Sequence, residues 1–118
     1  MKISILISSY NKGSYLEKCI QSCLNQKYND YEIILIDNES TDDTGSILKK
    51  YEKDITIRHS PKISKYSAVN QINLLNQALV ISSGEIICFL DADDYFENNK
   101  LQQLNNLFSD NYEVSVIF

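Results

Sequence analysis

The feature that most constrains the fold is the unbroken apolar run Ile33-Ile34-Leu35-Ile36, inside a predicted strand at Glu32–Asp37. A strand without alternating polar residues is typical of a parallel sheet that is covered on both faces. Similar runs occur at Ile3–Ser8 and Glu85–Leu90, and a weaker one, expected nearer a sheet edge, lies at Asp54–His59. The sequence therefore predicts a sheet whose apolar strands are buried on both faces.

Helical patterns separate these strands. Ser14 and Glu17 form a capping box for the first helix, in which Ser14 satisfies an early N–H group and Glu17 reaches back. The apolar stripe of this helix is Leu16, Cys19, Ile20, Cys23 and Leu24. Ser40–Asp43 provides N-cap chemistry for a second helix that extends to about Tyr51.

Two more helices are expected after a loop at Ser60–Tyr66. The third should end at Ser83-Gly84, because glycine is common just beyond a helix C-terminus. Its predicted apolar face is Ala68, Ile72, Leu75 and Leu79. Lys100–Phe108 predicts a fourth helix, and Glu113–Phe118 begins another strand.

The alternating order of strands and helices predicts an α/β fold with a mainly parallel sheet and right-handed crossovers. A chain of 118 residues is long enough for one compact domain. Its three Gly and one Pro mark no linker. We therefore expect one domain across residues 1–118.

Composition narrows the function classes. A net charge of −5 with no basic stripe argues against nucleic acid as a partner. Cys19, Cys23 and Cys88 lie in apolar segments and are expected to be buried free thiols, which suit a reducing, cytoplasmic location. The apolar run at the N-terminus is too short for a signal peptide or a membrane span.

Ligands of an open parallel sheet bind beyond the carboxyl ends of its strands. Three polar groups fall there, at Ser8–Asn11, Asp37–Ser40 and Asp91–Asp94. Acids and amides after a strand also make ordinary turns, and Tyr10 could simply fill one. The alternative is that Tyr10 stacks on a nucleotide base, and that the Asp37-Asn38 pair contacts a base or ribose.

The acids Asp91, Asp93 and Asp94 repel one another unless solvent or a cation relieves the charge. In an extended backbone Asp91 and Asp93 point the same way, which suits a hard divalent ion and a neighbouring hydroxyl. The alternative is that these acids cap the following helix in solvent. A short Asp-x-Asp motif does not decide between the two.

Four segments in fixed order resemble the glycosyltransferases of family 2, from Lys2 to about Leu101. They read ILISSYNK, CIQSCLNQ, YEIILIDNESTDDT and SGEIICFLDADD. The stretch Leu75-Asn76-Gln77-Ala78 is similar to the bacterial spore-coat polysaccharide transferase of that family. The resemblance implies a Rossmann-like GT-A fold with helices on both faces, in which residues 1–118 are the nucleotide-sugar-binding part, truncated before the acceptor-binding part.

The resemblance also implies residue roles. Ser8 and Tyr10 would line the nucleoside pocket, and Asp37 and Asn38 would face the base. The phosphate and metal contacts would come from Lys65 near the diphosphate, Asp91 at the ribose or metal, and Asp93 as the direct ligand of Mn²⁺ or Mg²⁺. No acid of this chain matches the catalytic base, which is expected beyond residue 118.

Two departures from the family pattern affect specificity. Asn38 stands where many members have a second Asp, so UDP, dTDP and GDP all remain open as donor nucleotides. Leu75-Asn76 stands where an Arg-Asn pair is common, so that cationic contact is missing.

The function implied is inverting, metal-dependent transfer from a nucleotide-diphosphate sugar to a hydroxyl of a sugar or lipid-linked acceptor. Cell-envelope or capsular polysaccharide synthesis is the expected setting, in the cytoplasm or peripheral to the inner face of the membrane. An alternative is a truncated or degenerate nucleotide-binding module without transferase activity, whose exposed sheet edge could support a homodimer.

Two other α/β classes fit less well. A receiver domain requires an acid pair after the first strand, where this chain has Ser8-Ser9-Tyr10-Asn11. A sugar nucleotidyltransferase requires a Gly-rich basic loop at the same place, where Gly13 is the single glycine.

Overall fold

The structure is a computed structural model, and it describes residues 1–111 and residue 113. Its elements are β1 (Ile3–Ser9), α1 (Gly13–Leu24), β2 (Tyr31–Asp37), α2 (Thr44–Tyr51), β3 (Thr56–His59), α3 (Ser67–Ile81), β4 (Ile86–Asp91) and α4 (Lys100–Asp110). The strand predicted at Glu113–Phe118 falls on a segment of which only Glu113 is described.

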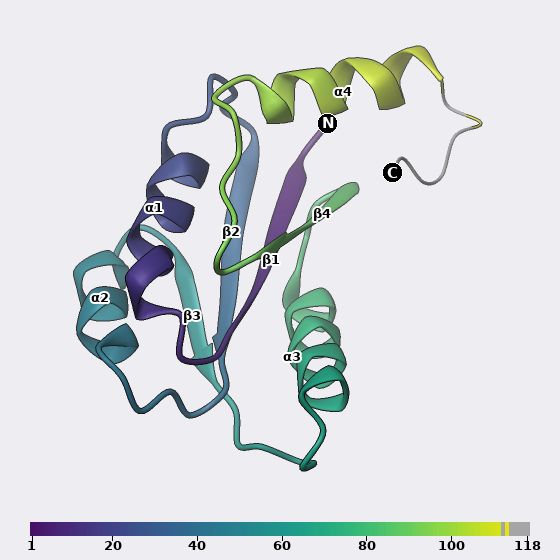
Figure 1. The fold of residues 1–118 in the computed structure, drawn as a ribbon. Helices are drawn as coiled ribbons and strands as arrows, with labels where there is room; N and C mark the ends of the chain where they lie inside the picture. Colours follow the sequence, from purple (N-terminus) through teal and green to yellow (C-terminus); the bar gives the residue numbers. More distant parts are fainter. Residues whose placement is uncertain (112, 114–118) are drawn as a thin grey trace.

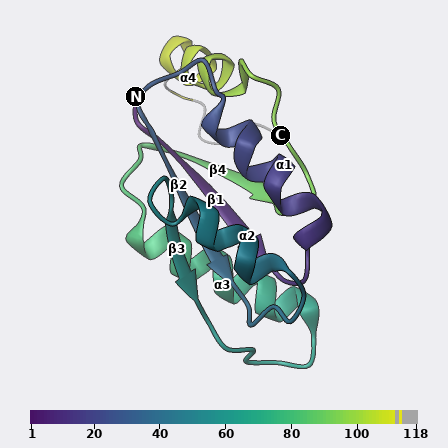
Figure 2. The ribbon, with the colours of Figure 1, turned by 90° about the vertical axis from the view of Figure 1, so that its left-hand side faces the viewer.

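The four strands form one sheet in the order β3-β2-β1-β4, and every neighbouring pair is parallel. Helices α1 and α2 cover one face and α3 covers the other, so the molecule has three layers (Figures 1 and 2). Helix α4 lies near the amino end of β1, away from the carboxyl ends of the strands. The predicted α/β class, parallel sheet and two-sided helical cover are confirmed.

Strand β2 shows why the sheet needs cover on both faces. Ile33 and Leu35 pack into the core under α1, α2 and α4, whereas Ile34 and Ile36 pack into a second core under α3. All four side chains are at most 4% exposed. The unbroken apolar run is therefore explained by two cores that meet at one strand.

All three cysteines are free and buried, as predicted. Burial raises the pKa of the Cys88 thiol, which keeps it protonated near neutral pH. Cys19 and Cys23 lie on the buried face of α1. The cysteines act as small apolar core residues.

The predicted apolar face of α3 is wrong except at Leu75, which is half-buried against the core under this helix. Ile72 and Leu79 are 60% and 45% exposed. The face that packs on the sheet consists of Asn70, Leu74 and Ala78. Apolar residues occur all round this helix, so spacing alone does not fix its rotation, and a buried polar residue, Asn70, belongs to the inward face.

The predicted capping box of α1 is also wrong. The helix begins at Gly13, two residues before the start that an N-cap at Ser14 implies, and neither helix α1 nor α2 has a side-chain N-cap of its own. Instead, the Asp42 carboxylate accepts hydrogen bonds from the N–H groups of Gly13 and Thr44, each at 3.0 Å. One acid thus caps the N-termini of both helices from a loop.

Gly84 is needed for a reason other than the one predicted. Helix α3 ends at Ile81, and no described glycine has a positive φ. A Cβ at Gly84 would lie 2.6 Å from the backbone nitrogen of Ser4, and the Gly84 N–H donates to the Ser4 hydroxyl. The glycine allows the chain to approach β1 closely before β4 begins.

Among the described residues, no helix combines the length and apolarity that crossing a membrane requires.

Replacing Asp42 with Ala should lower the free energy of unfolding at pH 7 by about 1–2 kcal/mol, because two helix N-termini lose their acceptor. Asp43→Ala is the charge-matched control, since the Asp43 side chain caps neither helix. Urea unfolding measures both. Equal losses in the two variants would contradict the shared cap.

The Asp42 contribution should also depend on pH. The nearby Thr44 side chain, and then the N–H groups of Gly13 and Thr44, lower the pKa of Asp42 from its ordinary 3.8. A lowered folded pKa means that the stabilisation is complete above the ordinary value and is lost as the pH falls through the folded value. The difference between wild type and Asp42→Ala should therefore shrink below about pH 4.

Candidate functional site

The register of the sheet brings the ends of all four strands to one edge. Ser8 pairs with Asp91 across β1 and β4, and Ser9 pairs with Asp37 across β1 and β2. Asp37 in turn pairs with His59 of β3. The three polar groups singled out in the sequence therefore follow neighbouring strands at the carboxyl edge.

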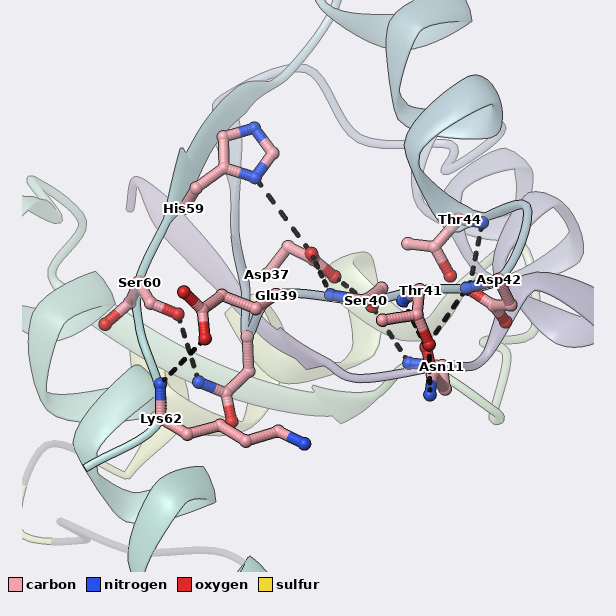
Figure 3. A network of polar contacts seen from close by, with 11 residues as sticks. Asn11, Asp37, Glu39, Ser40, Thr41, Asp42, Thr44, His59, Ser60 and Lys62 are labelled. Atoms are coloured by element: carbon pink, nitrogen blue, oxygen red, sulfur yellow. Dashed lines mark hydrogen bonds and ion pairs between the residues drawn. The ribbon is translucent and has the colours of Figure 1, made fainter. Parts of the chain in front are cut away.

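Asn11 ties the β1–α1 loop to the β2–α2 loop (Figure 3). Its side-chain oxygen accepts from the N–H of Thr41 at 2.7 Å and of Asp42 at 3.3 Å, and its own N–H donates to the Ser40 hydroxyl. Asn11 has φ of 48°, a conformation that Asn tolerates better than most residues. Sequence reasoning placed Asn11 at this edge but gave it no such role.

Asp37 stabilises the loop that follows β2 through hydrogen bonds. Its two carboxylate oxygens accept from the Ser40 N–H at 3.0 Å and the Ser40 hydroxyl at 2.6 Å. His59 Nδ1 lies 4.0 Å from the same carboxylate, which is 6% exposed (Figure 3). The contact of Asp37 with a nucleotide base stays a prediction, because the described hydrogen bonds use the carboxylate for the loop.

A hollow of about 220 Å³ opens beside these loops, on the side of α3. It is lined by Tyr10, Asn38, Lys62, Ser64, Lys65, Ser67, Asn70 and Gln71. Of the predicted contacts, Tyr10, Asn38 and Lys65 come together here, whereas Ser8, Asp37 and Asp91 do not line it. Asp91 borders the hollow through Gln71, whose Nε2 donates to Asp91 Oδ1 at 3.1 Å.

The Asn38 amide has a defined orientation. The side chain is buried, and Nδ2 donates to the carbonyl oxygen of Ser60 at 3.1 Å. Because that oxygen can only accept, the amide nitrogen must face Ser60. Asn38 Oδ1 accepts no hydrogen bond from the described residues, so it is available to a ligand of the hollow.

Asn70 holds the loop that forms one wall of the hollow. Its Oδ1 accepts from the N–H groups of Ile63 and Ser64 at 3.0 and 3.1 Å, and its Nδ2 donates to the Ser64 carbonyl at 2.8 Å. At the other end of the loop, Gln77 donates to the Ser60 hydroxyl at 2.7 Å. The buried polar residue of α3 therefore fixes the segment that carries Lys62 and Lys65.

Lys62 was missed by sequence reasoning. Its Nζ lies 3.8 Å from the centroid of the Tyr10 ring and donates to the Tyr10 hydroxyl. Its own N–H donates to Glu39 Oε2 at 3.4 Å (Figure 3). The local sequence of the loop at Ser60–Tyr66 does not indicate which of its lysines contacts Tyr10, because Tyr10 follows β1 and is distant in the sequence.

The three acids after β4 converge. Carboxylate oxygens of Asp91, Asp93 and Asp94 lie within 4.8 Å of one another, and all three residues are exposed. The Asp94 N–H donates to the Asp91 carbonyl, which closes the turn, and Lys12 Nζ lies 3.4 Å from Asp93 Oδ2. Three hard oxygen donors at this spacing suit a divalent cation such as Mn²⁺ or Mg²⁺.

A larger hollow, about 560 Å³, lies between α2 and the edge strand β3. It contains none of the predicted site residues. Size alone therefore does not identify the site. A hollow of about 410 Å³ is lined by Asp91 and Asp94 themselves, and the hollow beside Tyr10 reaches these acids through Gln71.

Comparisons with known proteins agree with this arrangement. Residues 4–118 match the family described as glycosyl transferase family 2. The poly(ribitol-phosphate) beta-glucosyltransferase of Bacillus spizizenii is 37% identical over an alignment of 117 positions, which covers 94% of this chain and 18% of that protein.

Solved structures share the fold. Staphylococcus aureus TarS in complex with UDP-GlcNAc is 25% identical, with a TM-score of 0.76 over 95% of this chain and 32% of that one. The mannosyltransferase PcManGT of Pyrobaculum calidifontis, with GDP-Man and Mn²⁺, is 22% identical, with a TM-score of 0.75 over 92% of this chain and 32% of that one. The chain thus spans 18–32% of the length of these relatives.

Replacing Asn70 with Ala should destabilise the protein by about 1–3 kcal/mol, because the loop loses three hydrogen bonds to a buried side chain. Hydrogen exchange of the Ile63 and Ser64 amides should accelerate at the same time. Asn76→Ala is the control, an exposed site on the same helix, with an effect within about 0.5 kcal/mol. Unchanged amide exchange in Asn70→Ala would contradict the role of Asn70 in holding this wall.

Proposed function

The chain belongs to glycosyl transferase family 2, and from this premise we propose that residues 1–118 form the donor-binding part of a glycosyltransferase. The observation that carries the proposal is the meeting of a base-sized polar hollow and three converging carboxylates at one sheet edge. The solved relatives hold UDP-GlcNAc and GDP-Man, which are nucleotide sugars.

The orientation of Asn38 selects among bases. With Nδ2 engaged by Ser60, Asn38 Oδ1 is left to accept a hydrogen bond from a ligand of the hollow that Asn38 lines. Uracil and thymine offer N3–H and guanine offers N1–H to this oxygen, whereas cytosine has an acceptor at N3 and can donate only through its exocyclic amino group. This favours a UDP-, dTDP- or GDP-linked sugar as the donor, with Tyr10 as the stacking platform and Ser8 beside the nucleoside.

A divalent cation fits the acids that follow β4. Asp93 would be its direct ligand, and Asp91 would share it or contact the ribose. When bound, Mn²⁺ or Mg²⁺ would neutralise charge on the departing diphosphate. Binding of the diphosphate beside these acids requires such an ion, because three carboxylates repel an anionic diphosphate and the chain itself has a net charge of −5.

The remaining chemistry follows the family reaction. A catalytic base deprotonates an acceptor hydroxyl, which attacks the anomeric carbon in a single displacement with inversion while the nucleotide diphosphate departs. None of the acids in residues 1–118 is assigned as this catalytic base. Residues of this chain bind the nucleotide base and orient the diphosphate. The acceptor is a sugar or a lipid-linked sugar of a cell-envelope or capsular polysaccharide, in line with the poly(ribitol-phosphate) acceptor named for the Bacillus relative.

Calorimetric titration with UDP, dTDP, GDP and CDP, each with and without Mn²⁺, tests the proposal. We expect Mn²⁺-dependent binding of at least one of the first three and weaker binding of CDP. Asp93→Ala should abolish the Mn²⁺-dependent part. Asp54→Ala, which removes an exposed acid before β3, should leave it intact.

Binding of CDP as tight as that of UDP would overturn the role of Asn38. Unchanged Mn²⁺ dependence in Asp93→Ala would overturn the metal assignment. No binding of any nucleotide by the folded chain would mean that the donor site in these residues is incomplete or degenerate.

A further inference from the structure

Lys62 occupies the ring of Tyr10, which the proposed function assigns to a nucleotide base. The ammonium lies 3.8 Å from the ring centroid, and it donates to the ring hydroxyl. Both side chains line the same hollow as Asn38. Lys62 therefore covers the platform from the side that a ligand of this hollow would approach.

The backbone that carries Lys62 is held in place. Its N–H donates to Glu39, and the flanking Ser60 and Ser64 are fastened by the buried amides of Asn38 and Asn70. A ligand that displaces Lys62 from Tyr10 therefore moves the flexible side chain and leaves the loop in position.

The contact between Lys62 and Tyr10 is of a kind that a ligand can break. Tyr10 is 39% exposed, and a cation–π contact at an exposed site is weak. Stacking of a base on an aromatic side chain is typically stronger. A base and an ammonium cannot occupy the same ring face, so binding of the base must release Lys62.

The released ammonium has a clear partner in a nucleotide diphosphate. Two lysines line the hollow, and the second, Lys65, lies 5.2 Å from the exposed ring of Tyr66. Lys12 is engaged by Asp93 on the acidic side. Leu75 stands where the family pattern commonly has an arginine, so that contact requires another cation, and Lys62 lines the hollow.

We propose that Lys62 is a displaceable clasp, which covers Tyr10 in the empty hollow and binds the diphosphate once a base has taken its place. The inference rests on the proposed function and deepens it. It assigns two opposite effects on affinity to Lys62. The side chain slightly weakens binding of the base and strongly favours binding of the phosphates.

The two effects separate when ligands with and without phosphates are compared. Lys62→Met keeps the length of the side chain and removes the charge. We expect this variant to bind UDP in the presence of Mn²⁺ about tenfold more weakly than wild type, which corresponds to one lost charge-assisted contact. Uridine should bind with equal affinity or up to about twofold more tightly.

Lys53→Met is the matched control, because it removes an exposed cation that lies outside the hollow. It should change the affinity for UDP by less than about threefold, as expected for a distant exposed charge. NMR titration of each protein with uridine and UDP measures both affinities, and thermal unfolding checks that the variants fold like wild type.

Equal weakening of uridine and UDP by Lys62→Met would overturn the clasp and make Lys62 a support of the pocket wall. An unchanged affinity for UDP in Lys62→Met, or an equal loss in Lys53→Met, would overturn the clasp while leaving the proposed function in place. Failure of the wild-type chain to bind UDP, dTDP or GDP would remove the proposed function and the clasp together.

Discussion

Burial of β1 and β2 on both faces is the constraint on which the rest of the structure depends. Ile33 and Leu35 complete one core, and Ile34 and Ile36 complete the other. A strand that is covered twice requires helices on both faces, and parallel strands joined through those helices must all end at the same edge. The polar loops at that edge are therefore a consequence of how the apolar strands are buried.

The polar side chains at this edge divide into two groups with different tasks. Asp37 and Asp42 are saturated by hydrogen bonds within the loops and contribute rigidity. Asp91, Asp93 and Asp94 keep exposed carboxylates that converge on one point. The rigid loops hold the hollow open, while Lys12 and Lys62, whose contacts are exposed, provide the charges that ligands can rearrange.

Local pattern was sufficient for the strands, their parallel arrangement and the common edge, because apolar periodicity and chain order determine these features. It failed where a partner lies far away in the sequence. The rotation of α3 depends on Asn70 reaching a loop, the start of α1 depends on Asp42, and Gly84 depends on its approach to β1. Lys62 could not be chosen over Lys65 for the same reason, since its partner Tyr10 belongs to another strand end.

The central claim is that the carboxyl edge of this sheet binds a nucleotide and a divalent cation as one site. Backbone amide NMR spectra of the chain, recorded while UDP and Mn²⁺ are added, test it most directly. Paramagnetic broadening should centre on Asp91–Asp94 and depend on the nucleotide, and it should extend to Tyr10 and Asn38 across the hollow. Broadening centred on the larger hollow between α2 and β3, or unaffected by the nucleotide, would contradict the account.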